Sequence, residues 1–136
     1  MARLAALFLA AALSFAAPAS EINLSATISV PQAVFRVEEA KKLNVSFTVT
    51  NSGTAAVDVD TGSSQLFING EAQKEWATTI VNGAGASYFR PLPAGQTLLF
   101  TYQLGPRYFS KPGVYKIRWK GPYYETPEIT FRVVPD

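Results

Sequence analysis

The chain contains no cysteine and no histidine. Without cysteine it has no disulfide to hold its core, no thiolate nucleophile and no lipid-bearing residue, which excludes a lipoprotein. Without histidine it lacks the usual general base at neutral pH and the commonest nitrogen ligand for metal ions. A hydrolase would therefore depend on paired carboxylates or on a serine and a lysine. We predict that the protein is not an enzyme and has no catalytic residue, no cofactor and no metal site.

The net charge is also small, because 12 lysine and arginine residues are set against 10 aspartate and glutamate residues, and Arg3 supplies one of the two excess positive charges. Proteins that bind nucleic acid present a strongly basic surface to the phosphates. The composition therefore argues against a nucleic acid partner.

The N-terminus has the features of a secretory leader. Arg3 precedes an uncharged run of alanine, leucine and phenylalanine over residues 4–17, and Ala17-Pro18-Ala19 forms a small-residue cleavage site. This pattern is typical of a signal peptide, here residues 1–19. An N-terminal membrane anchor is the alternative, but the run is shorter than the ~20 residues of a spanning helix. We expect residues 20–136 to form one exported domain, periplasmic or extracellular, with no membrane span.

Apolar and polar residues alternate along most of the remaining chain, which predicts short β-strands and no convincing helix. The hairpin signal Asn69-Gly70 separates two of these strands, and residues 32–42 predict a short helical turn or a solvated connection. The strands are expected at residues 21–30, 43–50, 55–60, 65–68, 72–79, 97–104, 114–120 and 129–133.

Two proline-glycine turns introduce the clearest pair of strands. Residues 92–96 read Leu-Pro-Ala-Gly-Gln before strand 97–104, and Pro112-Gly113 precedes strand 114–120. Proline and glycine suit the central positions of turns, so we expect these two strands to be adjacent. With the other strands they predict one antiparallel β-sandwich of seven or eight strands. A small closed barrel is the rival architecture, since both bury one face of every strand.

The segment that enters strand 114–120 resembles the start of strand F in immunoglobulin-like domains. In those domains a turn and a glycine precede a tyrosine that lies two residues before a core cysteine. Here Gly113 precedes Tyr115, which is at the tyrosine-corner position, and Ile117 is at the cysteine position. The resemblance implies an immunoglobulin-like sandwich without the disulfide.

A wider resemblance covers residues 44–133 and is to the intracellular proteinase inhibitor (BsuPI-type) domains of bacteria. The order of motifs is similar: a strand ending in Thr50-Asn51-Ser52-Gly53, a central hairpin with Trp76, then the two proline-glycine turns. It is also similar to immunoglobulin-like segments attached to secreted metallopeptidases. The resemblance implies proteinase inhibition as a function, but it carries over no inhibitory loop.

Three aromatic doublets lie between the strands, at Tyr88-Phe89, Tyr108-Phe109 and Tyr123-Tyr124. Adjacent residues of an extended chain point in opposite directions, so each doublet should bury one ring and expose the other. The connections that hold the first and third doublets are expected at the same end of the sandwich.

We predict that Tyr88, Phe89, Tyr123 and Tyr124 form a surface that binds another macromolecule, because loop aromatics bring large apolar area at low entropic cost. A protein partner is the first hypothesis, with proteinase inhibition as its sharpest version. A carbohydrate-binding module that uses the same rings is the second, and a hydrolase is the third. Alternatively, the rings only close the ends of the core.

Two charged groups have a binding interpretation and a structural one. Asp58 and Asp60 share the outward face of the predicted strand 55–60, and could hold calcium if another loop supplied oxygens. An exposed polar strand face is the simpler interpretation. A basic stripe, which Arg132 extends, could bind an anionic polymer or could only solvate the sheet. Its other members are Lys116, Arg118 and Lys120.

Overall fold

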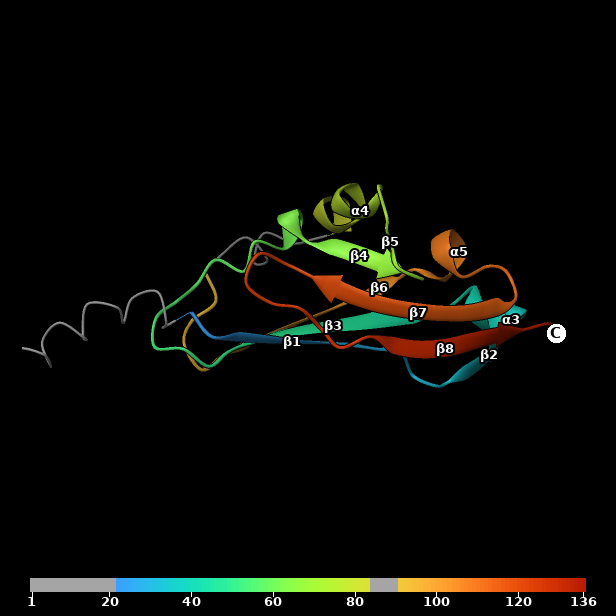
Figure 1. The fold of residues 1–136 in the computed structure, drawn as a ribbon, viewed down its shortest axis with the longest axis horizontal. Coiled ribbons are helices and arrows are strands. Elements are labelled where there is room, and N and C mark those ends of the chain that lie inside the picture. Colours follow the sequence, from blue (N-terminus) through green and yellow to red (C-terminus); the bar gives the residue numbers. More distant parts are fainter. Residues whose placement is uncertain (1–21, 84–90) are drawn as a thin grey trace, which may run out of the picture.

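The computed structural model describes residues 22–83 and 91–136, and they form two packed sheets (Figure 1). The predicted signal peptide, residues 1–19, lies outside these described residues. Sheet A has the order β1 (Leu24–Ser29), β3 (Asn44–Asn51), β6 (Thr97–Gln103). Sheet B has the order β2 (Val34–Arg36), β8 (Ile129–Val134), β7 (Gly113–Lys120), β4 (Gln65–Ile68), β5 (Glu71–Ala72). The helical segments are α3 (Val37–Ala40), η1 (Thr61–Ser63), α4 (Trp76–Gly83) and α5 (Gly105–Tyr108).

The two separate sheets confirm the predicted β-sandwich, since no described strand joins them into a closed barrel. Most of the strands predicted from alternation are present with the expected face inward. Phe47 of β3, Phe100 of β6 and Trp119 of β7 are all buried. The predicted hairpin at Asn69-Gly70 is also confirmed, since both residues have positive φ, at 51° and 84°.

The prediction that strands 97–104 and 114–120 are adjacent is wrong. β6 pairs with β3 in sheet A, whereas β7 pairs with β4 and β8 in sheet B. Turn residues predict where a strand begins but contain no information on which strand lies beside it. The connection between β6 and β7, which includes α5, therefore crosses from one layer to the other (Figure 1).

The sandwich is not wholly antiparallel, because β2 runs parallel to β8. β2 occupies part of the segment 32–42, and α3 is the short helical turn predicted there. The chain thus leaves sheet A after β1, crosses at Pro31, and joins the edge of sheet B.

The predicted strand 55–60 is absent. Only Val57 makes a β-bridge, with Leu92, and Asp60 has a left-handed backbone with φ 55°. Val59 is nevertheless buried as the alternation requires. One inward side chain holds this segment against the core without a ladder of hydrogen bonds.

The predicted strand 72–79 is also wrong, because β5 ends at Ala72 and α4 begins at Trp76. Trp76 and Ile80, four residues apart, are both 1% exposed and lie on one helix face. The Ile80 carbonyl accepts a hydrogen bond from the Tyr102 hydroxyl at 2.9 Å, which holds α4 beside β6. A helix therefore covers the side of the sandwich where β6 is the edge of sheet A.

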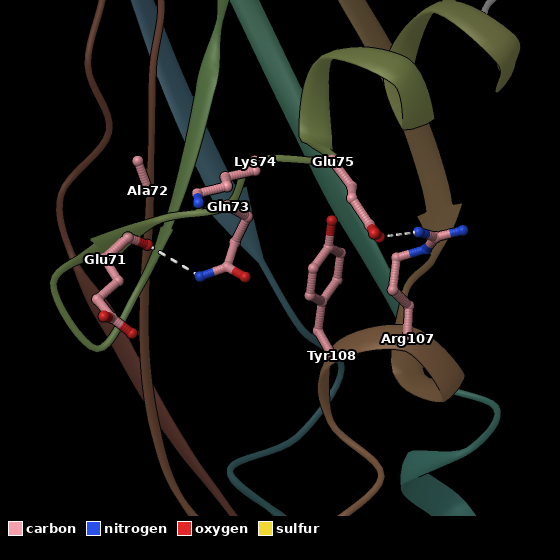
Figure 2. Close-up of a pocket in the computed structure, with 7 residues that line it drawn as sticks. All are labelled: Glu71, Ala72, Gln73, Lys74, Glu75, Arg107 and Tyr108. Carbon is pink, nitrogen blue, oxygen red and sulfur yellow. Dashed lines mark hydrogen bonds and ion pairs between the residues drawn. The ribbon is translucent and has the colours of Figure 1, made fainter.

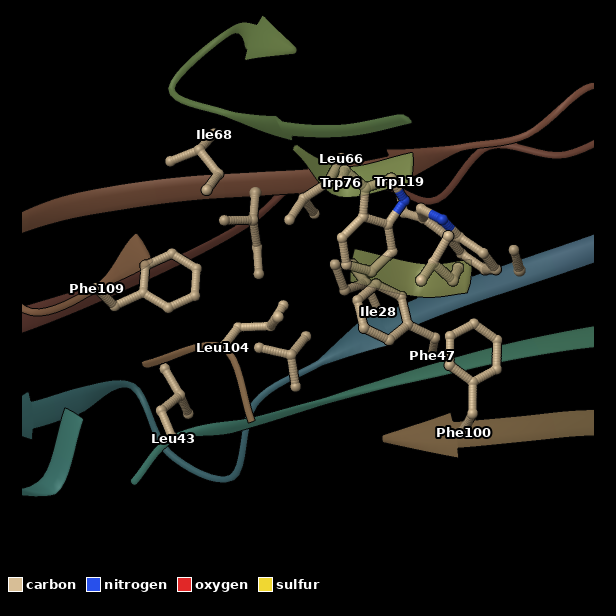
Figure 3. Packing of buried hydrophobic residues seen from close by; sticks show 14 of the residues in the cluster. Ile28, Leu43, Phe47, Leu66, Ile68, Trp76, Phe100, Leu104, Phe109 and Trp119 are labelled. Carbon is tan, nitrogen blue, oxygen red and sulfur yellow. The ribbon is translucent and has the colours of Figure 1, made fainter. Parts of the chain in front are cut away.

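The centre of the core is a group of aromatic rings contributed by both sheets and α4 (Figure 3). Phe47 lies 5.2 Å from Phe100, 5.3 Å from Trp76 and 5.1 Å from Trp119, measured between ring centroids. Aromatic contacts of this kind join the layers without a disulfide. The same rigid core supports both ends of the sandwich.

Candidate functional site

The loop between β7 and β8, residues 121–128, carries the predicted contact residues that the structure describes. The Gly121 N–H donates to the Tyr124 carbonyl, and the Thr126 N–H donates to the Trp119 carbonyl, each at 2.9 Å. The Trp119 N–H in turn donates to the Thr126 hydroxyl at 2.9 Å. These hydrogen bonds close the loop onto the end of β7 and restrict its conformation.

The doublet in this loop buries one ring and exposes the other, as predicted. Tyr123 is 51% exposed, whereas Tyr124 is 6% exposed and packs 4.7 Å from Trp119 between ring centroids. Gly121 makes room for this packing, since a Cβ there would lie 2.1 Å from the Tyr124 ring. Tyr124, a predicted contact residue, therefore supports the loop from inside, and Tyr123 is the ring presented to solvent.

The Tyr124 hydroxyl is buried without a hydrogen-bond partner among the described residues. Burial raises its pKa well above the ordinary value of 10.0, and the nearby carboxylate of Asp60 raises it further. The ring is therefore neutral at physiological pH.

The other two aromatic doublets add no described exposed ring beside the 121–128 loop. Tyr88 and Phe89, both predicted contact residues, lie outside the described residues. Phe109 is fully buried and Tyr108 is half-buried in α5, at the opposite end of the sandwich from the 121–128 loop (Figure 1). The structure therefore shows one exposed aromatic ring, Tyr123, in the predicted contact surface that it describes.

Asp58 and Asp60 form a turn of their own. The Asp58 carboxylate accepts a hydrogen bond from the Asp60 N–H at 2.9 Å, which satisfies it locally. Across residues 22–83 and 91–136, no group of three histidine, cysteine, aspartate or glutamate side chains could hold a metal ion. No described carboxylate completes a calcium site at this turn.

The predicted basic stripe lies on the outward side of sheet B, and we call it the cationic face. It consists of Lys116, Arg118 and Lys120 of β7 and Arg132 of β8. Arg118 stacks 3.9 Å above the Phe67 ring centroid and pairs with Glu125 at 2.7 Å. Among the described residues, no ion pair neutralises the other three cations.

The outward side of sheet A, which we call the neutral face, carries hydroxyls instead. Hydroxyl pairs link the strands: Thr27 with Thr48, Ser46 with Thr101 at 3.2 Å, and Thr50 with Thr97 at 2.9 Å. No outward position of its strands is charged. Threonines paired across strands stabilise a sheet, and here they form a surface without charge.

A polar pocket of about 450 Å³ lies between the β5–α4 connection and α5 (Figure 2). Glu75 and Arg107 form an ion pair across it, and Gln73 donates to the Glu71 carbonyl at 3.0 Å. Burial raises the pKa of Tyr108, whose hydroxyl points toward Glu75 in the same pocket. Because both signs of charge line the pocket and the central pair is already satisfied, it favours no particular class of ligand.

No protein-family model matches the chain, and no curated protein matches it. None of the helices in the described part of the chain is long and apolar enough to cross a bilayer. The functional argument therefore depends on the fold and on these surfaces.

Sequence reasoning missed both the pocket and the neutral face. The sequence pattern predicts a strand over residues 72–79, and a strand there would not form the connection that lines the pocket. The helical spacing of Trp76 and Ile80 was the signal that could have corrected this prediction. The neutral face was visible as serine and threonine at alternate positions of three strands. Its extent became clear only when β1, β3 and β6 proved to be neighbours.

Proposed function

We propose that the domain is an exported, non-catalytic, immunoglobulin-like module that binds another protein through its 121–128 loop. The strand order supports the fold assignment. In immunoglobulin domains strands A, B and E share one sheet, and C, F and G share the other. The order β1-β3-β6 corresponds to A-B-E, and β8-β7-β4-β5 corresponds to G-F-C-C′. α4 lies beside β6, where strand D would be.

The tyrosine corner gives independent support. The Tyr115 hydroxyl donates to the Lys111 carbonyl at 2.6 Å, four residues upstream, as the tyrosine of strand F does in such domains. Ile117, two residues later, is fully buried where those domains have a cysteine. Ile117 belongs to the same buried apolar cluster as Trp119 and Phe131, and burial in this cluster would take the place of the missing disulfide.

One observation carries the binding function: an exposed aromatic ring on a loop that is already fixed. Tyr123 is presented on a turn anchored by Gly121, Tyr124 and Thr126. Binding orders little further chain in such a loop, so most of the contact energy of the ring goes into affinity. Inhibition of a proteinase is one function that this arrangement suits.

The test is affinity capture from the exported fraction of the producing cell, followed by measurement of Kd with the purified partner. Wild type is compared with Tyr123→Ala, which leaves the buried anchor Tyr124 in place. Leu99→Ala is the matched control, because it removes a 61% exposed apolar side chain from the neutral face. We expect Tyr123→Ala to weaken binding at least about tenfold, as loss of an aromatic hot spot does.

Equal affinity of wild type and Tyr123→Ala for every captured protein would contradict the proposal. Retardation of the wild type on an immobilised polysaccharide, lost in Tyr123→Ala, would instead identify a carbohydrate-binding module. A panel of proteinases assayed with both proteins tests the inhibitor version directly.

A further inference from the structure

The four edges of the two sheets differ in how well they are protected from pairing with another strand. β2 has three residues and carries Arg36, and β5 has two residues and carries Glu71. β6 has α4 beside it. Short strands, charge and covering elements are the usual means of blocking an edge. β1 is six residues long, residues 22–35 contain no charged side chain, and no strand or helix of the described residues covers its outer edge.

The backbone of β1 has a free side. The Ser52 N–H donates to the Asn23 carbonyl, which defines the hydrogen-bonded pairs between β1 and β3. By alternation, the N–H and C=O groups of Leu24, Ala26 and Ile28 point to the other side. Within the described residues no strand pairs with that side.

Beside the end of this edge lies a shallow groove of about 310 Å³. Ile28 and Val30 line it from the β1 side, and Ile129 lines it from β8, where the chain crosses between sheets. A ligand that fits both features must supply a main chain with alternating donors and acceptors, and also an apolar side chain. Only an extended polypeptide does so.

The chain itself contains that polypeptide. Ile22, two residues before β1, is an apolar side chain with 40% of its surface exposed. If two β1 strands pair antiparallel about Ala26, Leu24 of one copy lies opposite Ile28 of the other, and Ile22 lies opposite Val30. Every free backbone group then meets its counterpart, and each Ile22 reaches the groove of the second copy.

We propose that two copies of this chain associate through β1, antiparallel and centred on Ala26, so that the two neutral faces join into one continuous sheet surface. The register places no like charges opposite one another, because β1 has none. The interface is closed and two-fold, as most homo-oligomeric interfaces are. The interface uses no residue of the 121–128 loop. The dimer proposal can therefore be tested independently of the binding partner proposed above.

The first test is sedimentation of the full chain, with its N-terminus determined by mass spectrometry, from about 1 to about 300 µM. We expect a monomer–dimer equilibrium in this range. In the register proposed, Ser25 of one copy lies opposite Thr27 of the other. Ser25→Lys/Thr27→Lys therefore places lysine opposite lysine twice and should raise the dimer Kd at least about tenfold.

The matched control is Thr97→Lys/Thr101→Lys, which adds the same charge to β6 on the same face but two strands from the proposed axis. It should leave the Kd within about threefold of wild type. A wild type that stays monomeric throughout the range would overturn the proposal. So would equal weakening by the two double variants.

The second test uses the absence of natural cysteine. Ser25→Cys mixed with Thr27→Cys should give a disulfide-linked dimer under mild oxidation, since opposite residues of a non-hydrogen-bonded pair have Cα atoms about 4.5 Å apart. Either variant alone should cross-link several-fold less, because identical positions are too far apart. Equal cross-linking in all three samples would overturn the register.

Discussion

The neutral face and the cationic face share one sandwich but present opposite chemistry. On sheet A, hydroxyls from neighbouring strands satisfy one another, as Thr50 and Thr97 do at 2.9 Å. On sheet B, Lys116 and Arg132 have no ion pair among the described residues, and only Arg118 is neutralised. The polar groups of one surface satisfy one another, whereas the other surface carries cations without an ion pair among the described residues. A net charge near zero therefore conceals a group of cations on one face of the molecule.

The largest effect should come from removing the support that both faces share. Phe47→Ala deletes a ring that contacts Phe100, Trp76 and Trp119, and should reduce the free energy of unfolding by about 3–5 kcal/mol. Urea unfolding followed by tryptophan fluorescence and by far-ultraviolet circular dichroism measures the loss. Two separate unfolding transitions in the variant would mean that the two sheets are stable independently. The two faces would then not depend on one shared core.

A smaller loss should be confined to the sheet of the cationic face. Tyr115→Phe removes the hydrogen bond to the Lys111 carbonyl at the start of β7 and should cost about 1 kcal/mol. Tyr123→Phe is the control, because its exposed hydroxyl is solvated in both states. Hydrogen exchange of β7 and β3 amides would show whether the loss stays within sheet B. Equal stability of both variants would remove the tyrosine corner as a stabilising feature.

Salt should distinguish the two faces more directly. Lys116→Gln/Arg132→Gln removes two unpaired cations and should raise stability at low ionic strength by about 0.5 kcal/mol, because repulsion along the face is relieved. The gain should vanish at high salt, where the charges are screened. Thermal unfolding across a salt series measures it. A gain that persists at high salt would indicate packing instead of charge.

The smallest effect is expected on the neutral face. Thr50→Val/Thr97→Val replaces both members of one hydroxyl pair with side chains of the same shape, and stability should stay within about 0.5 kcal/mol of wild type. The single variants each leave one hydroxyl without its partner, but both are exposed to water. Chemical denaturation provides the measurement, and a loss above 1 kcal/mol in the double variant would show that the hydroxyl array holds the sheet together.

The alternation of apolar and polar residues predicted most of the strands, because it shows directly which side chains of a strand point inward and which point outward. Strand 43–50 is an example: Phe47 points inward and Thr48 outward, as its sequence indicates. Pairing between strands depends on contacts between residues far apart in the chain, so the parallel pairing of β2 with β8 left no local signal, although strand 129–133 itself was predicted. β2 is also too short, at three residues, for alternation to identify it.

The candidate site, like the fold, could be predicted only in part from the sequence. The doublet Tyr123-Tyr124 indicated that one ring would be buried, but not which. The deciding residue is Gly121, whose missing side chain leaves the space that the Tyr124 ring occupies. That relation depends on the turn of the loop in three dimensions. A glycine three residues before an aromatic residue has no such meaning in a sequence by itself.

The parallel pairing of β2 with β8 also has a consequence for the time course of folding. It joins residues 34–36 to residues 132–134, close to the two ends of the described chain. At ribosomal rates, the interval between synthesis of these two segments is roughly 5–20 s. Throughout that interval β2 has no strand to pair with, and closing so long a loop adds to the entropic barrier. The sandwich therefore completes its second layer only after residues 132–134 have been made.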